Sequence, residues 1–155
     1  MNTAIILHDI RSIHNVGSIW RTADCSGVGK IYLTGYTPSP HDRFGRTRKD
    51  LAKTALGAEK NVPFEKTTDI FSVLEKLKKE KFRLIAVEQS PDSIDYKKVK
   101  RGKKIAFILG NEVEGLSPEI LKECDTVAEI PMYGKKESLN VGVAAGIALF
   151  KIMGI

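Results

Sequence analysis

Two continuous apolar stretches constrain the fold of this chain more than any other feature. They lie within Arg83–Glu88 and Ile105–Leu109, and neither alternates apolar with polar residues. Strands of this kind are typical of the centre of a parallel sheet, where helices cover both faces. Further strands are expected at Thr3–His8, Lys30–Thr34, Val62–Glu65 and Val127–Ile130. Helices are expected at Val16–Ser26, Lys49–Leu56, Thr68–Glu80, Pro118–Glu123 and from Ser138 onward. This alternation predicts an α/β fold with a mostly parallel sheet flanked by helices.

The chain of 155 residues contains no internal repeat, low-complexity tract or long linker, so we predict a single domain over residues 1–155. Its net charge of +6 favours a polyanionic partner such as RNA or DNA, although a basic enzyme without such a partner fits as well. Cys25 and Cys124 lack metal-ligand spacing and are expected to be reduced and buried, and no metal is predicted. The first residues lack the features of a secretion signal, so a cytoplasmic location is expected.

The C-terminal segment Ser138–Ile155 is mostly apolar and contains Gly142-x-x-x-Gly146, a pattern that promotes helix pairing in bilayers. Asn140 and Lys151 interrupt it within less than the roughly 20 apolar residues that a membrane span needs. A helix that is apolar on most of its circumference is instead buried in its domain or in a subunit interface. We favour the interface, and therefore a homodimer without membrane contact.

Ligands of open α/β sheets bind beyond the carboxyl ends of the strands. The loop after Leu7 leads to Asn15, Gly17 and Arg21. Asn15 suits a helix N-cap, and Gly17, one turn before Arg21, is expected to clear space beside it. We expect Arg21 to contact a phosphate or a ribose.

The loop after Leu109 begins Gly-Asn-Glu at residues 110–112. Gly110 and Gly115 have the spacing of a phosphate-binding loop, but Leu116 stands where that loop requires Lys, which excludes a nucleoside triphosphatase of this type. Two acidic residues in the loop suit a ligand with hydroxyl groups and a positive centre.

The third loop follows Ile130 and leads to Ser138, a plausible N-cap, and to Asn140, which would be buried in the helix unless it contacts a ligand or polar backbone. A separate basic stretch near Tyr36 and Phe44 is expected to dock RNA phosphates and bases. Its RNA-binding candidates are Arg43, Arg46, Arg48 and Lys49. The lysines of residues 97–104 are expected to be a solvated loop.

Three motifs in this order resemble the SpoU (TrmH-like) branch of the SPOUT RNA methyltransferases. They are Asn15-x-Gly-x-x-x-Arg21, Ile108-Leu-Gly-Asn-Glu-x-x-Gly-Leu116, and Ile130-Pro-Met…Ser138-Leu-Asn-Val141. The resemblance implies S-adenosylmethionine as methyl donor, a ribose 2′-hydroxyl of tRNA or rRNA as acceptor, an obligate dimer and a C-terminal deep trefoil knot. General rules of chain topology alone would argue against the knot.

By matching position, the resemblance assigns the cofactor to Gly110, Ile130, Met132, Ser138 and Leu139. It assigns RNA placement and catalysis to Asn15, Arg21, Glu112, Asn140 and also Ser138. Because a guanidinium stays protonated in proteins, we expect Arg21 to anchor phosphate and steady the oxyanion, with Glu112 or solvent accepting the proton.

Two alternatives remain at this stage, a non-catalytic RNA-binding protein with the same fold and an RNA base methyltransferase of another SPOUT branch. The expected domain carries no appended RNA-binding domain, so RNA choice would fall to this domain and its dimer.

Overall fold

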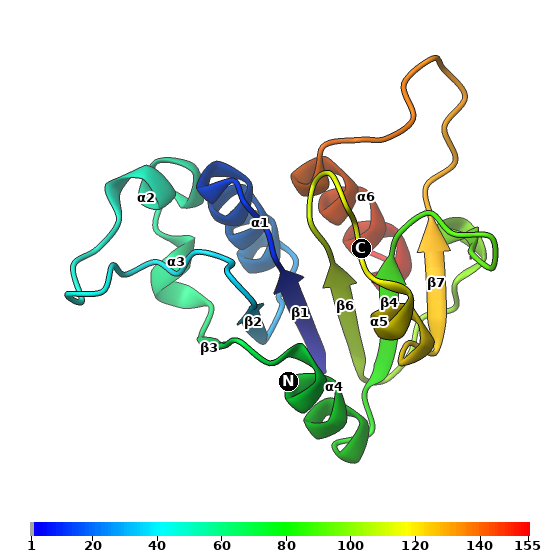
Figure 1. Cartoon of the computed structure of the whole chain (residues 1–155), viewed down its shortest axis with the longest axis horizontal. Coiled ribbons are helices and arrows are strands. Elements are labelled where there is room, and N and C mark those ends of the chain that lie inside the picture. Colours follow the sequence, from blue (N-terminus) through cyan, green and yellow to red (C-terminus); the bar gives the residue numbers. More distant parts are fainter. Residues whose placement is uncertain (1) are drawn as a thin grey trace.

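The computed structural model describes residues 2–155, which form one seven-stranded sheet in the order β3-β2-β1-β6-β4-β7-β5 (Figure 1). Every neighbouring pair of strands is parallel. The strands are β1 (Thr3–His8), β2 (Lys30–Thr34), β3 (Phe64–Thr67), β4 (Arg83–Val87), β5 (Ile94–Asp95), β6 (Ile105–Leu109) and β7 (Thr126–Glu129). The predicted α/β class and parallel sheet are confirmed.

Strand β6 lies at the centre of the sheet, between β1 and β4, and every one of its residues is buried. Successive side chains of a strand point to opposite faces. Phe107 and Leu109 therefore join one hydrophobic core, and Ala106 and Ile108 join a second core on the other face. This double burial explains why the strand is continuously apolar.

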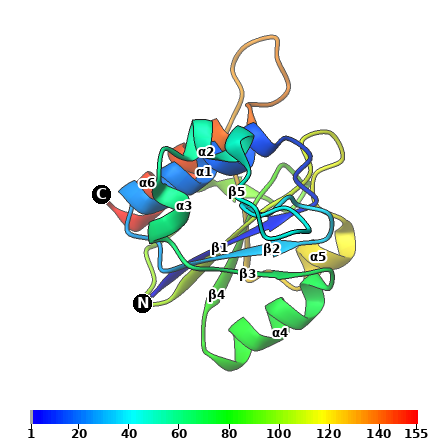
Figure 2. The same cartoon turned by 90° about the vertical axis from the view of Figure 1, so that its left-hand side faces the viewer.

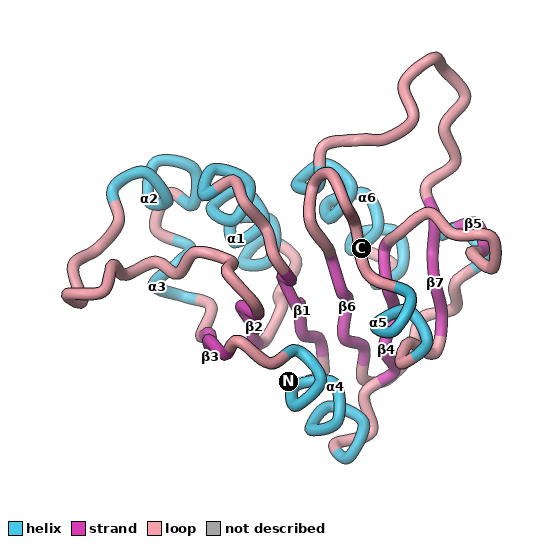
Figure 3. The backbone as a smooth tube through the Cα atoms, viewed as in Figure 1, coloured by secondary structure: helices cyan, strands magenta, loops and turns pink. Residues whose placement is uncertain are grey.

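The helices form two outer layers around the sheet (Figure 2). One core lies beneath α1 (Ile13–Cys25), α2 (Lys49–Ala55), α3 (Ala58–Asn61) and α6 (Val141–Met153). The other lies beneath α4 (Ile70–Lys79) and α5 (Pro118–Lys122). A short 3₁₀ turn at Tyr96–Lys98 follows β5. Figure 3 shows that the long loops lie mainly at the carboxyl ends of the strands.

Two predicted helix starts are wrong. Helix α1 begins at Ile13, because the Ser12 hydroxyl accepts the backbone N–H of Asn15 and caps the helix three residues earlier than expected. Helix α6 begins at Val141, because Asn140, not Ser138, is its N-cap and accepts from the N–H groups of the first turn. As a result, Asn15 lies in the first turn of α1 and Asn140 is the N-cap of the adjacent helix α6.

Small residues bring the helices of this layer close together. A Cβ atom added to Gly17 would lie 2.1 Å from Thr54 Oγ1 and 2.6 Å from the Leu51 carbonyl oxygen. The space at Gly17 is therefore occupied by α2, and the prediction that Gly17 clears space beside Arg21 is wrong. Added Cβ atoms at Gly142 and Gly146 would face Ser18 and Thr22 of α1. The glycine pair of α6 therefore packs within this chain.

The outer side of α6 keeps an apolar surface. Val143 and Phe150 are exposed, and Ile147 between them is half-buried. Within residues 2–155, no helix is both long enough and apolar enough to cross a bilayer.

The two cysteines have different environments. Cys25 is exposed at the end of α1, so its predicted burial is wrong: it falls on the outer face of the helix. Cys124 is half-buried, its thiol donates to the Ile120 carbonyl oxygen, and burial raises the pKa of this thiol to about 12.

Candidate active site

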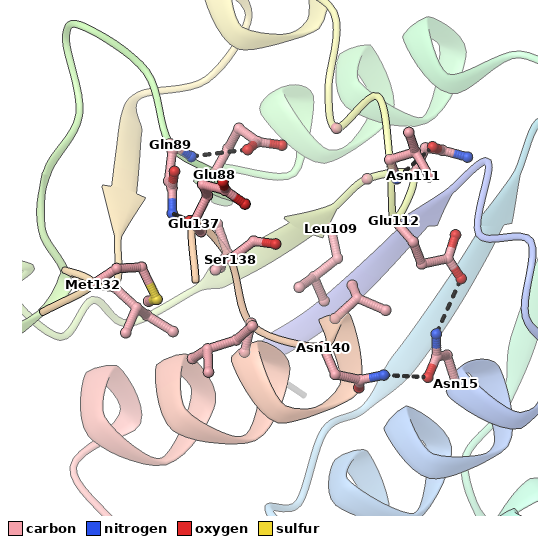
Figure 4. A pocket seen from close by; sticks show the side chains of 18 residues that line it. Asn15, Glu88, Gln89, Leu109, Asn111, Glu112, Met132, Glu137, Ser138 and Asn140 are labelled. Carbon is pink, nitrogen blue, oxygen red and sulfur yellow. Dashed lines mark hydrogen bonds between the residues drawn. The ribbon is translucent and has the colours of Figure 1, made fainter. Parts of the chain in front are cut away.

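A cleft of about 700 Å³ opens where the carboxyl ends of β4 and β6 meet the segment between β7 and α6 (Figure 4). The structure brings all five residues predicted to hold the cofactor to this cleft: Gly110, Ile130, Met132, Ser138 and Leu139. Three of the four residues predicted to be catalytic, Asn15, Glu112 and Asn140, also line it. A volume of this size is typical of sites for small molecules and cofactors.

The loop from Gly110 to Leu116 is shaped by one buried side chain. Asn111 Oδ1 accepts the N–H groups of Val113 and Glu114, each at 2.8 Å. Gly115 has a φ of +66°, and a Cβ atom added to Gly110 would lie 2.7 Å from the carbonyl carbon of Gly115. Glycine is required at both places, because one has a left-handed backbone and the other lies against the returning chain. The spacing that resembles a phosphate loop thus serves a tight turn.

Glu88 and Gln89, which follow β4, line the same cleft and were missed in the sequence. Glu88 Oε2 accepts the N–H of Leu116 at 3.1 Å, and Gln89 Nε2 donates to the carbonyl oxygen of Glu137 at 2.7 Å. Each therefore fixes one wall of the cleft. The rule that led to the loops after Leu7, Leu109 and Ile130 applies equally to the end of β4, and it would have found them.

A chain of hydrogen bonds joins Glu112, Asn15 and Asn140 along one edge of the cleft (Figure 4). Asn15 Nδ2 donates to Glu112 Oε1 at 3.1 Å, and Asn140 Nδ2 donates to Asn15 Oδ1 at 3.0 Å. Asn140 Oδ1 caps α6. Each amide group is used on both sides, so its orientation follows from its partners. Asn140 contacts polar backbone as the N-cap, which is one of the two exceptions to burial expected from the sequence, and it lies exposed at the cleft edge.

Glu112 is held as a carboxylate at the start of α1. Burial raises its pKa, but hydrogen bonds from the backbone N–H groups of Arg11 and Ser12 and from Asn15 outweigh this, and the pKa lies below its ordinary value. Oε2 accepts from Arg11 at 2.9 Å, and Oε1 accepts from Ser12 at 3.0 Å. The position at a helix N-terminus also favours negative charge. With both oxygens engaged, this carboxylate is suited to orient Asn15.

Arg21 is not brought to the cleft. It is exposed on α1, six residues beyond Asn15, which corresponds to about 9 Å along the helix axis. Within residues 2–155, it makes no side-chain hydrogen bond or ion pair.

The other predicted RNA-binding residues lie beyond β2, on the side of the molecule away from the β7–α6 segment (Figure 1). Two of them are paired with aspartates, Arg46 with Asp42 at 2.8 Å and Arg48 with Asp50 at 3.1 Å. Arg43 and Lys49 form no ion pair within the described part of the chain.

Comparison with known proteins shows to which family this chain belongs. A family model described as "SpoU rRNA Methylase family" matches residues 2–150. A Staphylococcus saprophyticus protein described as a TrmH family tRNA/rRNA methyltransferase is 31% identical over 98% of this chain. The chain spans 58% of that relative's length.

Two solved structures of methyltransferases or RNA-modifying enzymes have a fold similar to that of this chain. The TrmH/SpoU tRNA modifying enzyme of A. aeolicus has a TM-score of 0.85 at 29% identity, covering 99% of this chain and 74% of its own. An AdoMet-bound rRNA methyltransferase from Sinorhizobium meliloti has a TM-score of 0.83 at 28% identity, covering 97% of this chain and 55% of its own. With the family model matching nearly the whole sequence, the chain belongs to the SpoU methylase family of RNA methyltransferases.

Proposed function

We propose that this protein uses S-adenosylmethionine to methylate a ribose 2′-hydroxyl of tRNA or rRNA in the cytoplasm. The observation that carries the proposal is the convergence, on one cleft, of the five cofactor candidates with the hydrogen-bonded chain Glu112–Asn15–Asn140. Residues from both ends of the sequence meet there, and the motifs that identify the family supply all of them.

The cleft has the chemistry that S-adenosylmethionine requires. Its apolar lining suits an adenine ring and the methylene groups of the methionine chain, and it includes Val87, Leu109, Ile130, Met132, Leu139, Val141 and Ala144. The hydroxyl of Ser138 is suited to a ribose hydroxyl, and the negative charge of Glu88, whose oxygens also accept the N–H groups of Gln89 and Leu116, favours a charged amino group nearby. The S. meliloti neighbour was solved with AdoMet bound. When bound, the cofactor supplies an electrophilic methyl group.

The remaining residues position the acceptor. Methyl transfer to oxygen depends on alignment of the two reacting atoms, so rigid polar groups at the cleft edge contribute most. Asn15 and Asn140 form that edge, and Glu112 fixes their orientation. Because Glu112 is fully hydrogen-bonded and its pKa is lowered, solvent is the better proton acceptor in this account. Arg21 stabilises the developing negative charge and anchors an RNA phosphate.

Arg21 can do this only if a second subunit completes the site, because it lies outside the cleft of its own chain. We infer a homodimer formed through the outer faces of α1 and α6, where Val143, Ile147 and Phe150 form an apolar surface. Arg21 lies on the same helical layer and would approach the partner's cleft. The basic residues Arg43, Arg46, Arg48 and Lys49 extend the RNA surface.

We also infer the trefoil knot implied by the family. Helix α6 packs against β4 and β6 and beside α1, although the chain enters it from β7. The long segment of residues 130–140 therefore carries the chain from the end of β7 back to the start of α6 (Figure 1). A return of this kind is consistent with α6 passing behind the loop of residues 110–117.

Calorimetric titration with S-adenosylhomocysteine tests the cofactor site. We expect one molecule per subunit to bind. Ala144→Trp, which fills the cleft from α6, should abolish binding, whereas Glu75→Trp, exposed on α4 at the other face of the sheet, should leave it unchanged. Absence of binding by the folded native protein, or equal binding by both variants, would contradict the proposed site.

A further inference from the structure

A second group of polar contacts lies beside the cleft and takes no direct part in the proposed methyl transfer. It joins the carboxyl ends of three adjacent strands, β2, β1 and β6, through Tyr36, Asp9 and Asn111. Of these residues, only Asn111 lines the cleft. The group therefore connects the cleft with the segment that follows β2.

Asn111 is held by Tyr36. Asn111 Nδ2 donates to Tyr36 Oη at 2.8 Å and to the backbone oxygen of Asp9 at 3.0 Å. Its Oδ1 accepts the two N–H groups of the loop. Asn111 is only 8% exposed, and all of its side-chain hydrogen-bonding groups are occupied. Tyr36 is the one side chain among these partners, since the others are backbone atoms.

Tyr36 is itself anchored close to its hydroxyl contact. Its backbone N–H donates to Asp9 Oδ1 at 3.1 Å. The preceding residue, Gly35, has a φ of +61°, and a Cβ atom there would lie 1.8 Å from the same carboxylate oxygen. Only glycine lets the chain pass so near Asp9. The path of residues 35 and 36 is therefore fixed against the end of β1.

The tip of the loop that Asn111 shapes has little packing, although Glu112 and Leu116 on either side of the tip are anchored by hydrogen bonds to other segments. Val113 is 81% exposed, and Glu114 is also exposed. Loops of this kind, with little apolar packing, are held by their hydrogen bonds and open readily. Glu112 lies in the middle of this turn, so the hydrogen bonds of Asn111 help to set the backbone position from which Glu112 reaches Arg11, Ser12 and Asn15.

The ring of Tyr36 faces solvent at the start of the basic segment, residues 36–48. It is 57% exposed. Phe44, in the same segment, is also exposed, and the guanidinium carbons of Arg43 and Arg46 lie 4.7 and 5.0 Å from the centre of its ring. Exposed aromatic rings among cations are suited to stack on bases and bind phosphates. A nucleotide bound along this segment would contact the ring whose hydroxyl holds Asn111.

We propose that Tyr36 is a positioning residue that couples RNA bound on residues 36–48 to the cleft loop, acting through Asn111 on Glu112. RNA that restrains the Tyr36 ring restrains Asn111 and with it the turn at residues 111–115. The inference rests on the proposed methyl transfer for its catalytic consequence, but its structural step, tightening of the loop by RNA, can be measured without turnover.

The test uses Tyr36→Phe, which keeps the exposed ring and removes the hydroxyl. Hydrogen exchange of the Val113 and Glu114 amides should be about tenfold faster in the variant, because Asn111 loses a partner. Adding bulk tRNA should slow exchange of these amides in the native protein and not in the variant, although both bind tRNA equally. In methylation assays, kcat should fall about tenfold with KM for RNA changed less than twofold. Phe44→Ala is the control and should raise KM without altering exchange.

Equal protection by tRNA in the native protein and Tyr36→Phe would overturn the coupling. So would faster exchange with an unchanged kcat, which would make the contact merely structural. Failure of the native protein to bind S-adenosylhomocysteine would count against the proposed function instead, since the exchange measurement needs no cofactor.

Discussion

Asn140 Nδ2 donates a hydrogen bond of 3.0 Å to Asn15 Oδ1, although the two residues are 125 positions apart in the sequence. The bond joins the start of α6 to the start of α1. Each asparagine also makes a hydrogen bond with another partner, since Asn140 Oδ1 caps α6 and Asn15 Nδ2 donates to Glu112. These partners fix which end of each amide group carries the nitrogen and which the oxygen, and therefore where donors and acceptors lie on the cleft edge.

Substitution of Asn140 separates its two roles. Asn140→Ala removes the cap and should destabilise the protein by about 1 kcal/mol. Asn140→Asp keeps the cap oxygen but replaces the donor to Asn15 by a second acceptor. We expect this variant to unfold in urea close to the native midpoint and to lose most of its methylation rate. Full activity in Asn140→Asp would show that the Asn15 contact has no part in catalysis.

Glu112 should contribute to the pH dependence of stability. Its folded pKa lies below the value of the free side chain, so its contribution is fully present above the unfolded pKa and is lost as the pH falls through the folded pKa. Glu112→Gln replaces one acceptor by a donor and removes this contribution. The stability difference between native protein and variant, measured by urea unfolding, should be largest near neutral pH and shrink below the ordinary carboxyl pKa of about 4.5. A stability difference that is constant with pH would refute this role of Glu112.

Glycine substitutions on the two packed helices should have opposite consequences. Gly17→Ala would place a methyl group 2.1 Å from Thr54 Oγ1 and 2.6 Å from the backbone of Leu51, so overpacking should cost about 1–3 kcal/mol despite the better helix propensity of alanine. In Gly146→Ala, the added Cβ would lie 3.8 Å from Thr22 Cγ2, an ordinary contact. We expect that variant to be as stable as the native protein or more so, as judged by thermal unfolding. Equal destabilisation by both would contradict the packing described.

Arg21 should act on the cleft of the other subunit. Arg21→Ala should lower turnover about 100-fold by removing a charge that stabilises the oxyanion, with unfolding unchanged because the side chain is exposed. Co-expression of Arg21→Ala with Asn140→Asp should restore about a quarter of native activity, since half of the dimers are mixed and each contains one intact site. If Arg21 acts within its own chain, the mixture will stay as inactive as its parents.

Much of the fold follows from local apolar patterns. The strands Thr3–His8, Lys30–Thr34 and Ile105–Leu109 have the predicted bounds, because each is an apolar run that ends at polar or turn-forming residues. The weaker strand predicted at Val62–Glu65 lies at Phe64–Thr67, since an edge strand is defined by its pairing with β2 and not by its own composition.

The candidate site was predictable as a set of residues but not as an arrangement. The resemblance to the family, carried over by matching position, led to Gly110, Met132 and Ser138, which line the cleft. It could not show that Ser12 and Asn140 are the caps, because the competing candidates lie within three residues and differ only in the contacts that the folded chain allows. The contacts of Tyr36 with Asn111, and of Glu88 with Leu116, join separate loops, and no local pattern marks them.

Methyl transfer from S-adenosylmethionine to a ribose of RNA can be followed with a labelled methyl group. The most direct test incubates the purified protein with methyl-labelled S-adenosylmethionine and bulk RNA from cells that lack its gene, and then identifies the labelled nucleoside after complete digestion. We expect label in a 2′-O-methylated nucleoside, and far less of it when Asn140→Asp replaces the native protein. Label in a methylated base, or no label although the protein binds both cofactor and RNA, would contradict it.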